Sequence, residues 1–321
     1  MSKNLFCECY KNFFGKIFSI NDYGETHKLV TLLGIKIKIM KPEYQKKVRE
    51  NSYSYYVKNN IDITQIPPAE GQIRDIQLAN LALLKELNYV CEINGLKYWL
   101  DFGSLLGAIR HKGFIPWDDD VDTGMLREDY NKLIDVFEKT SRNPDIFASY
   151  VVNKKHPCEM FIKIQHKKCP HLFVDVFPYD FYGKKLTKDE QIKFSQDMKS
   201  ICSAMQKVCP KKAKQQEIRN LIEKNVRIAK ASDYSEDGSD LMWGLDYFHF
   251  HKNWFTNYNV VFPLKKILFE GEMFPCMNNP EEFLNNVYGN YMTYPKKIGV
   301  GHAMFLNLSE NDKKIISELK Q

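Results

Sequence analysis

The sequence predicts an α/β (α+β) fold in which helices flank a mixed β-sheet, with a small basic segment in front. Apolar residues recur at helical spacing in residues 72–94 and 126–140. By contrast, the runs MFIKIQ (160–165) and LFVDVFPYD (172–180) alternate apolar and polar side chains as strands do. Helices and strands that follow one another in this way are typical of a sheet covered by helices.

The first 60 residues carry the whole net charge of the chain. They contain 11 Lys and Arg against 5 Asp and Glu, while the rest of the chain is balanced. A basic excess outside the main body argues against a nucleic-acid-binding protein. It fits attraction to an anionic membrane surface or a solvated tail. The run IKIKIM (35–40) predicts a strand or hairpin, and QIPPAEG (65–71) predicts a domain boundary. We therefore expect a basic segment at 1–66, able to associate with a membrane, and a catalytic domain at 67–321.

The elements of the main domain follow in order. Gly95 stands where the C-cap of the helix 72–94 is expected. LKYWLDFGSLLGAIR (96–110) predicts a strand, a turn and a helix, and the helix 126–140 comes next. A Lys-rich helical pattern at about 187–231 predicts an inserted pair of helices. Residues 269–295 predict loops and short helices before a final helix at 309–320.

The cysteines and the N-terminus bear on the compartment. Eight cysteines are scattered without a CxxC pair, and the first residues lack the long apolar core of a secretory signal. No apolar run approaches the ~20 residues of a membrane span. We expect reduced thiols in a cytoplasmic protein, with peripheral attachment to the inner face of the membrane as an option. Cys158, His166, Cys169 and His171 match no standard zinc spacing, so we expect no zinc.

Four aspartates crowd into WDDDVDTGM (117–125). In an extended strand, Asp118, Asp120 and Asp122 share one face, and Asp119 faces the other. Carboxylate oxygens are the ligands that Mg²⁺ and Mn²⁺ prefer, and such ions keep positions open for phosphate. A solvated acidic loop is the alternative, against which the large apolar residues between the aspartates argue. We therefore predict Asp120 and Asp122 as metal ligands, with Asp118 as a further ligand or a support.

Residues on either side of the aspartates extend this site toward a phosphate. Gly103 and Ser104 form a tight turn into a helix, whose N–H groups can hold a phosphate or simply be capped. Arg110 and Lys112 are placed to neutralise a pyrophosphate. Asp175, on a second apolar strand, offers a third carboxylate that holds a metal or accepts a proton. The set predicts phosphoryl or nucleotidyl transfer.

The segment GSLLGAIRHKGFIPWDDDVDTGMLREDY (103–130) resembles the signature of the LicD family, which includes the fukutin-type transferases and belongs to the nucleotidyltransferase superfamily. The resemblance continues through MFIKI, FVDVFPYD and FEGEMFPCMNNPEEFLNNVYGNY, and so covers about residues 70–295. It implies a nucleotidyltransferase-like sheet. It also adds Lys163 and Glu270 as candidates that line the donor or acceptor cleft, with surface ion pairs as the alternative for both. Arg127 is a further candidate donor-binding residue, for which a contact with neighbours on its own helix is the alternative. Residues 14–39 are similar to a leader segment of bacterial surface-glycan enzymes.

Members of this family move a phospho-alcohol, such as phosphocholine or ribitol phosphate, from a CDP-linked donor to a sugar hydroxyl. The resemblance therefore implies a Mg²⁺- or Mn²⁺-dependent phosphotransferase of bacterial lipopolysaccharide or other surface-glycan biosynthesis. CDP-choline is the favoured donor, a glycan or lipid-linked saccharide is the acceptor, and CMP is released. Two alternatives stay open. One is a nucleotidyltransferase that uses an NTP and releases pyrophosphate, and the other is a non-catalytic glycan- or membrane-binding module of the same fold.

Overall fold

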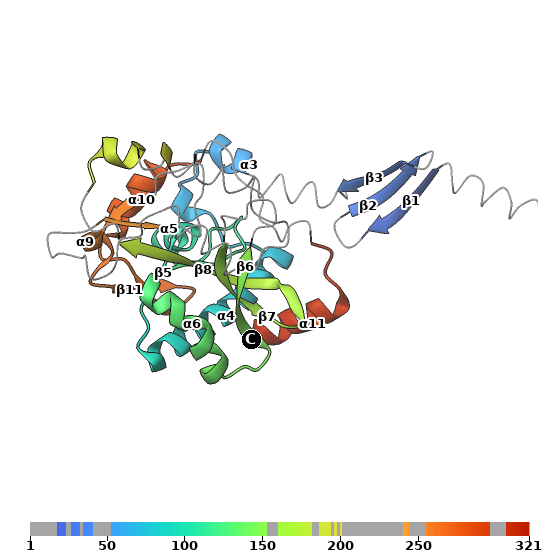
Figure 1. Ribbon diagram of the computed structural model, residues 1–321. Helices are drawn as coiled ribbons and strands as arrows, with labels where there is room; N and C mark the ends of the chain where they lie inside the picture. Colours follow the sequence, from blue (N-terminus) through green and yellow to red (C-terminus); the bar gives the residue numbers. More distant parts are fainter. Residues whose placement is uncertain are drawn as a thin grey trace, which may run out of the picture. The chain divides into compact units, whose positions relative to one another are not determined.

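The computed structural model describes residues 18–23, 27–32, 35–40, 53–152, 160–181, 186–193, 196–197, 200, 240–243, 255–295 and 306–320. The chain divides into two compact units, Met1–Ile63 and Thr64–Gln321 (Figure 1). Most of the predicted helical insertion at 187–231 lies outside the described residues, as does Cys158. Membrane association of the basic front segment stays a prediction.

The first unit contains a small antiparallel sheet. It is formed by β1 (Phe18–Tyr23), β2 (His27–Leu32) and β3 (Ile35–Met40), in that order. The strand predicted at 35–40 is β3, so this prediction is confirmed. A short helix, α3 (Tyr53–Lys58), follows.

In the described part of the second unit, seven strands form a mixed sheet. The order is β10-β9-β8-β5-β4, and β7 pairs with both β6 and β8. β5 and β8 run parallel, while the other pairs are antiparallel. The mixed sheet and the strands predicted at 160–165 and 172–180 are confirmed. The strands are β4 (Tyr98–Leu100), β5 (Asp122–Leu126), β6 (Ile146–Val152), β7 (Met160–His166), β8 (Cys169–Phe181), β9 (Asp240–Trp243) and β10 (Phe255–Asn257).

Helices cover the sheet. α4 (Gly71–Asn94) and α6 (Arg127–Thr140) pack against β8 and against each other, whereas α5 (Phe102–His111) packs on β5 and on α10 (Pro280–Tyr288) (Figure 1). The helix predicted at 72–94 is α4, and Gly95 ends it with the left-handed φ of 66° that glycine adopts at no steric cost. The described remainder contains η1 (Ile63–Gln65), α9 (Tyr258–Val261) and α11 (Glu310–Leu319).

One segment differs from the prediction. Residues 265–276 form an antiparallel hairpin of β11 (Lys265–Phe269) and β12 (Glu272–Cys276), where loops and short helices were expected. Glu270 and Gly271 form its two-residue turn, both with positive φ. The buried rings of Phe269 and Phe274 fix the hairpin on the body, in edge-to-face contact at 6.2 Å. Within the described ranges, no helix is long and apolar enough to cross a bilayer.

Gly124 and Trp99 are cross-strand partners on β5 and β4, and they generate a test of the packing. A Cβ at position 124 would collide with the buried Trp99 indole. We expect Gly124→Ala to lower the free energy of unfolding by about 1–3 kcal/mol, as overpacking does. Trp99→Phe in the same background should recover part of this loss, because the fused ring is gone. Urea unfolding of both single variants and the double variant measures the coupling, which strictly additive effects would contradict.

Candidate active site

The pairing of β5 with β8 places two predicted site residues side by side. Asp122 begins β5 and lies opposite Asp175 in the parallel register of β8. The Asp175 N–H donates to the Val121 carbonyl at 2.8 Å, and the Thr123 hydroxyl donates to the Asp175 carbonyl at 2.8 Å. Neighbours in register project to the same face of a sheet, so both carboxylates belong to one surface.

Lys163 supplies the cation of this surface. It is the antiparallel partner of Asp175 on β7, and its Nζ lies 2.5 Å from Asp175 Oδ1. Both side chains are mostly buried, with exposed fractions of 16% and 11%. The same ammonium lies 3.5 Å from the centroid of the Phe173 ring. Lys163 was predicted to bind the donor, and the structure places it on the third predicted carboxylate.

Asp101 caps α5 next to these strands, and the sequence analysis missed it. Its fully buried carboxylate accepts hydrogen bonds from the Phe102 N–H at 2.9 Å and the Tyr179 hydroxyl at 2.7 Å. Its own N–H donates to the Asp122 carbonyl at 3.0 Å. Burial raises the pKa of Asp101 to about 7, against the effect of these two hydrogen bonds. An aspartate directly before a helical turn is an N-cap signature, which is the signal that could have found it.

The first turn of α5 touches the aspartate cluster. A Cβ on Gly103 would lie 2.9 Å from Asp118 Oδ2 and 3.7 Å from Asp122 Oδ2. The buried Ser104 Oγ accepts a hydrogen bond from the Asp122 N–H at 2.8 Å. The positive end of the helix dipole favours negative charge at this position. Ser104 therefore anchors the start of β5, and its part in holding a phosphate stays a prediction.

The expected extended strand through the aspartates is wrong for residues 118–121, which form a loop, and β5 begins only at Asp122. Side-chain amides of α4 explain the difference. Gln77 Nε2 and Asn80 Nδ2 donate to the main-chain carbonyls of the first two loop aspartates, at 2.6 Å and 2.7 Å. These bonds take the place of a strand ladder. Asp119 is nevertheless buried away from solvent, whereas Asp118 and Asp120 are partly exposed.

The carboxylates of the cluster raise one another's pKa. For Asp118 the causes are burial, then the charge of Asp120 and the hydrogen bond between the two side chains. For Asp122 the causes are burial, then the charges of Asp120, Asp175, Asp118 and Asp101. Within the described ranges, no Lys or Arg forms a salt bridge with Asp118, Asp120 or Asp122. The cluster thus concentrates negative charge that these side chains do not neutralise.

The donor chemistry of this cluster suits a hard divalent cation. All its acidic groups are carboxylates, and a cation would relieve the charge repulsion that, after burial, raises the pKa values of Asp118 and Asp122. In the part of the chain that the structure describes, no three Asp, Glu, His or Cys side chains are arranged so that they could hold a metal ion. The ligand roles of Asp118, Asp120, Asp122 and Asp175 therefore stay predictions.

Arg110 lies beside the aspartates. Its side chain is buried, Nη1 donates to the Tyr291 carbonyl at 3.0 Å, and Nε has no partner among the described residues. Burial lowers its pKa to about 10, and Tyr288, Asp118 and Tyr294 oppose this shift. The residue therefore carries a positive charge next to Asp118, where the sequence predicted a group that neutralises phosphate.

Two other predicted donor-binding residues have structural contacts. Lys112 ends α5 in the left-handed conformation, with φ 58°, and its exposed ammonium donates to the Ile109 carbonyl at 3.3 Å. Arg127 forms a bidentate ion pair with the buried Asp180, at 2.7 Å and 2.8 Å. These contacts hold a turn and a strand end, and they do not bring either residue into the aspartate cluster.

Glu270 also has a structural set of partners. Its carboxylate pairs with both terminal nitrogens of Arg74, at 3.0 Å and 2.6 Å, and accepts the Phe114 N–H at 3.0 Å. Its own N–H donates to the Lys112 carbonyl at 2.8 Å. Glu270 therefore fixes the loop that leads from α5 to the aspartates. Its predicted contact with the donor stays a prediction, because the observed contacts are those of a positioning residue.

Tyr288, at the end of α10, is a second residue that the sequence analysis missed. Its side chain is 38% exposed. Loss of solvent at its hydroxyl raises its pKa well above the usual range, and the charges of Asp122, Asp101 and Asp118 add to this rise. The tyrosine thus lies close to the cluster and is accessible to a ligand.

Comparison with known proteins shows which family this chain belongs to. The model "LicD/FKTN/FKRP, nucleotidyltransferase domain" matches residues 95–214, which include β4 to β8 and the aspartate loop. The lipopolysaccharide cholinephosphotransferase LicD of Haemophilus influenzae is 31% identical over 252 residues, which are 70% of this chain and 92% of that protein. This chain belongs to the LicD family.

Two further relatives match shorter stretches of this chain. Ribitol 5-phosphate transferase FKRP of Homo sapiens is 35% identical over 109 residues, which are 34% of this chain and 22% of that protein. The uncharacterized protein RT0683 of Rickettsia typhi is 34% identical over 104 residues, which are 31% of this chain and 34% of that protein. The family predicted from the sequence is confirmed.

Two glycines of α5, Gly103 and Gly107, allow a variant that disturbs the candidate site to be compared with one that disturbs the packing. A Cβ at Gly103 meets only aspartate side chains, whereas a Cβ at Gly107 would collide with the backbone of the following loop. We expect Gly107→Ala to lower the melting temperature by several degrees and Gly103→Ala to leave it nearly unchanged while catalysis is lost. Thermal unfolding and the catalytic turnover number, measured for both variants and the wild type, test this expectation. Equal destabilisation by both substitutions would contradict the close approach of the carboxylates to α5.

His111, the last residue of α5, predicts a pH dependence. Neither ring nitrogen has a partner among the described residues, and burial, with the charge of Arg110, lowers its pKa to about 4. Between pH 6.5 and about 4, the unfolded chain therefore binds a proton that the folded chain does not. The contribution of neutral His111 to the free energy of unfolding is fully present above pH 6.5 and falls as the pH drops toward 4. We expect His111→Gln to lose less unfolding free energy between about pH 7 and about pH 5 than the wild type, by urea titration.

Proposed function

We propose that this chain transfers a phospho-alcohol from a CDP-linked donor to a glycan hydroxyl and releases CMP, with Mg²⁺ or Mn²⁺ bound. The observation that carries the proposal is that Asp118 and Asp122 meet at the first turn of α5, with Asp175 paired beside Asp122, within the region that matches the family model. Phosphocholine is the first choice of group because the relative matched over 92% of its length is named a lipopolysaccharide cholinephosphotransferase. Ribitol phosphate is the second choice, from the name of FKRP.

The surroundings of the cluster support binding of an anionic donor. The N-terminus of α5 presents main-chain N–H groups and the positive end of its dipole at Gly103. Arg110 adds a positive charge beside Asp118. A divalent cation held by Asp120 and Asp122, with the support of Asp118, would neutralise the pyrophosphate oxygens that these carboxylates otherwise repel.

The transfer step makes one bond and breaks another. The oxygen of the acceptor hydroxyl bonds to the β-phosphorus, and the bond from this phosphorus to the bridging oxygen breaks. The electron pair of that bond leaves on CMP, and the hydroxyl proton moves to a carboxylate. Asp175 is the candidate acceptor of the proton, because it adjoins Asp122 and is held in place by Lys163.

Removal of one charge from the cluster tests the metal role. Mg²⁺ or Mn²⁺ together with CDP-choline should raise the melting temperature of the wild type, since a ligand that binds only the folded state stabilises it. We expect Asp120→Asn to abolish this shift and to reduce CMP release by at least about 100-fold. Its own melting temperature should hold or rise, because a repulsive charge is gone.

The control is Asp135→Asn, which removes an exposed carboxylate on α6 outside the cluster. This variant should keep the metal-dependent shift and the turnover. Full CMP release by Asp120→Asn would contradict the metal role. Release of pyrophosphate from an NTP by the wild type, without CMP release from any CDP-alcohol, would show nucleotidyl transfer instead.

A further inference from the structure

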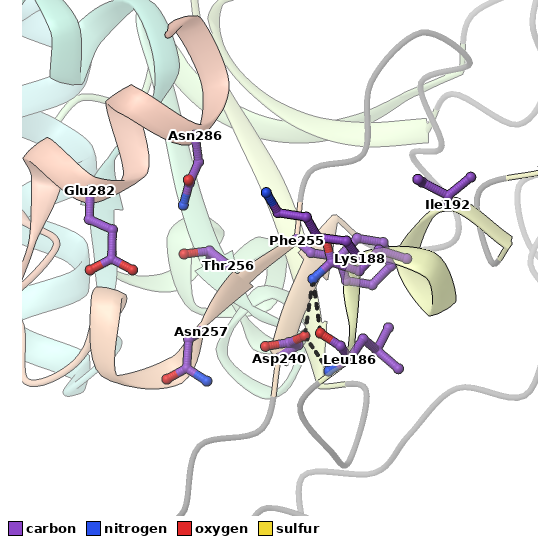
Figure 2. A pocket seen from close by; sticks show the side chains of 10 residues that line it. Leu186, Lys188, Ile192, Asp240, Phe255, Thr256, Asn257, Glu282 and Asn286 are labelled. Carbon is purple, nitrogen blue, oxygen red and sulfur yellow. Dashed lines mark hydrogen bonds between the residues drawn. The ribbon is translucent and has the colours of Figure 1, made fainter.

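A cavity of about 520 Å³, lined by both polar and apolar side chains, lies beside α10 (Figure 2). Its volume is within the ~300–1,000 Å³ of small-molecule sites. The side chains come from β9, β10, α10 and the segment that follows β8. The polar groups that matter below are Asp240, Thr256, Asn257, Glu282 and Asn286.

Thr256, which lines this cavity, is 4% exposed, and its buried hydroxyl has no hydrogen-bond partner among the residues that the structure describes. A buried hydroxyl without a partner is unfavourable, and a ligand that bonds to it removes this penalty. Figure 2 shows the side chains of Thr256, from β10, and Asn286, from α10, among those that line the cavity. The amide of Asn286 is exposed and lines the same cavity.

The charges of the cavity exclude one ligand class and favour another. Asp240, which is buried and accepts the Leu186 N–H at 2.7 Å, and Glu282 contribute two negative charges. The exposed Lys188 contributes the one positive charge in the lining. Among the described lining residues, acidic side chains outnumber basic ones, which disfavours a phosphate or a nucleotide. Hydroxyl, amide and carboxylate groups together both donate to and accept from the hydroxyls of a neutral sugar.

Helix α10 connects this cavity with the aspartate cluster. Glu282 and Asn286 line the cavity, while Tyr288, at the end of the same helix, lies near Asp122 and Asp118. Two residues turn a helix by more than half a circle, so Asn286 and Tyr288 lie on opposite sides of α10. A ligand that reaches from one side to the other must span about one helix diameter, ~10 Å.

We infer that this cavity binds a neutral saccharide unit of the acceptor glycan, while the hydroxyl that is phosphorylated belongs to a neighbouring unit. The inference rests on the proposed function, because it assigns a place to the acceptor of that reaction. It requires an acceptor of at least two sugar units. A monosaccharide fills the cavity without presenting a hydroxyl at the carboxylates.

The experiment compares three variants of the full chain. Thr256→Val removes the hydroxyl at nearly constant volume, and Asn286→Ala removes an exposed amide, so both should fold. Asn285→Ala is the matched control, an exposed asparagine of α10 that does not line the cavity. The probes are lactose and other neutral disaccharides, whose binding is measured by saturation-transfer NMR without a donor.

We expect Thr256→Val and Asn286→Ala to weaken disaccharide binding by about tenfold each, the effect of one lost hydrogen bond. Asn285→Ala should bind as the wild type does, and the KM for CDP-choline in its hydrolysis by water should be the same in all three. Wild-type affinity in both cavity variants, or no binding of any disaccharide by the wild type, would overturn the inference. A raised KM for CDP-choline would also overturn it by placing the nucleotide there. Absence of CMP release would refute only the proposed function, because the binding measurement needs no donor.

Discussion

The parallel pairing of β5 with β8 is the constraint on which the candidate site depends. β5 has only five residues and is held on both edges, by β4 and by β8. A slip of one residue would turn Asp122 to the opposite face of the sheet and separate it from Asp175. The core opposes such a slip, because Gly124 leaves room for the Trp99 indole and any side chain moved into its place would collide with that ring. The packing of Trp99 on the β4 edge of β5 thus fixes the register of Asp122 with Asp175 on the β8 edge.

Two helices then set how close the charges come. Asn80 of α4 donates to the carbonyl of Asp119 and accepts from the Phe173 N–H at 2.9 Å, so it joins the aspartate loop to β8. The absent Cβ of Gly103 lets the loop carboxylates approach the first turn of α5. The aspartates of the loop are therefore positioned by neutral amides and by the helix backbone, and not by lysines. Because these groups are uncharged, the negative charge of the aspartates can be neutralised by a cation.

Local patterns predicted the elements that a single periodicity defines, including α4, α6, β7 and β8, and the spacing of the acidic residues predicted the cluster. The Arg74–Glu270 pair could not be predicted in this way, because its partners lie 196 residues apart and each alone resembles a surface charge. The same holds for Asn80, which bonds to β8 across 93 residues. The loop at 118–121 was predicted as a strand from the alternation of its side chains. That pattern does not show that side-chain amides of α4, and not a neighbouring strand, bond to its main-chain carbonyls.

The distribution of cations around the carboxylates indicates an order of binding. Lys163 already neutralises Asp175 at 2.5 Å, whereas Asp118, Asp120 and Asp122 have no such partner in the described part of the chain. A first divalent cation would gain more from these three than from displacing a mostly buried ammonium, since removing one partner of a buried pair leaves the other uncompensated. Under the proposed function, Asp175 then stays outside that first metal sphere. On that proposal it would be the carboxylate that takes the acceptor's proton, with Lys163 holding it in place.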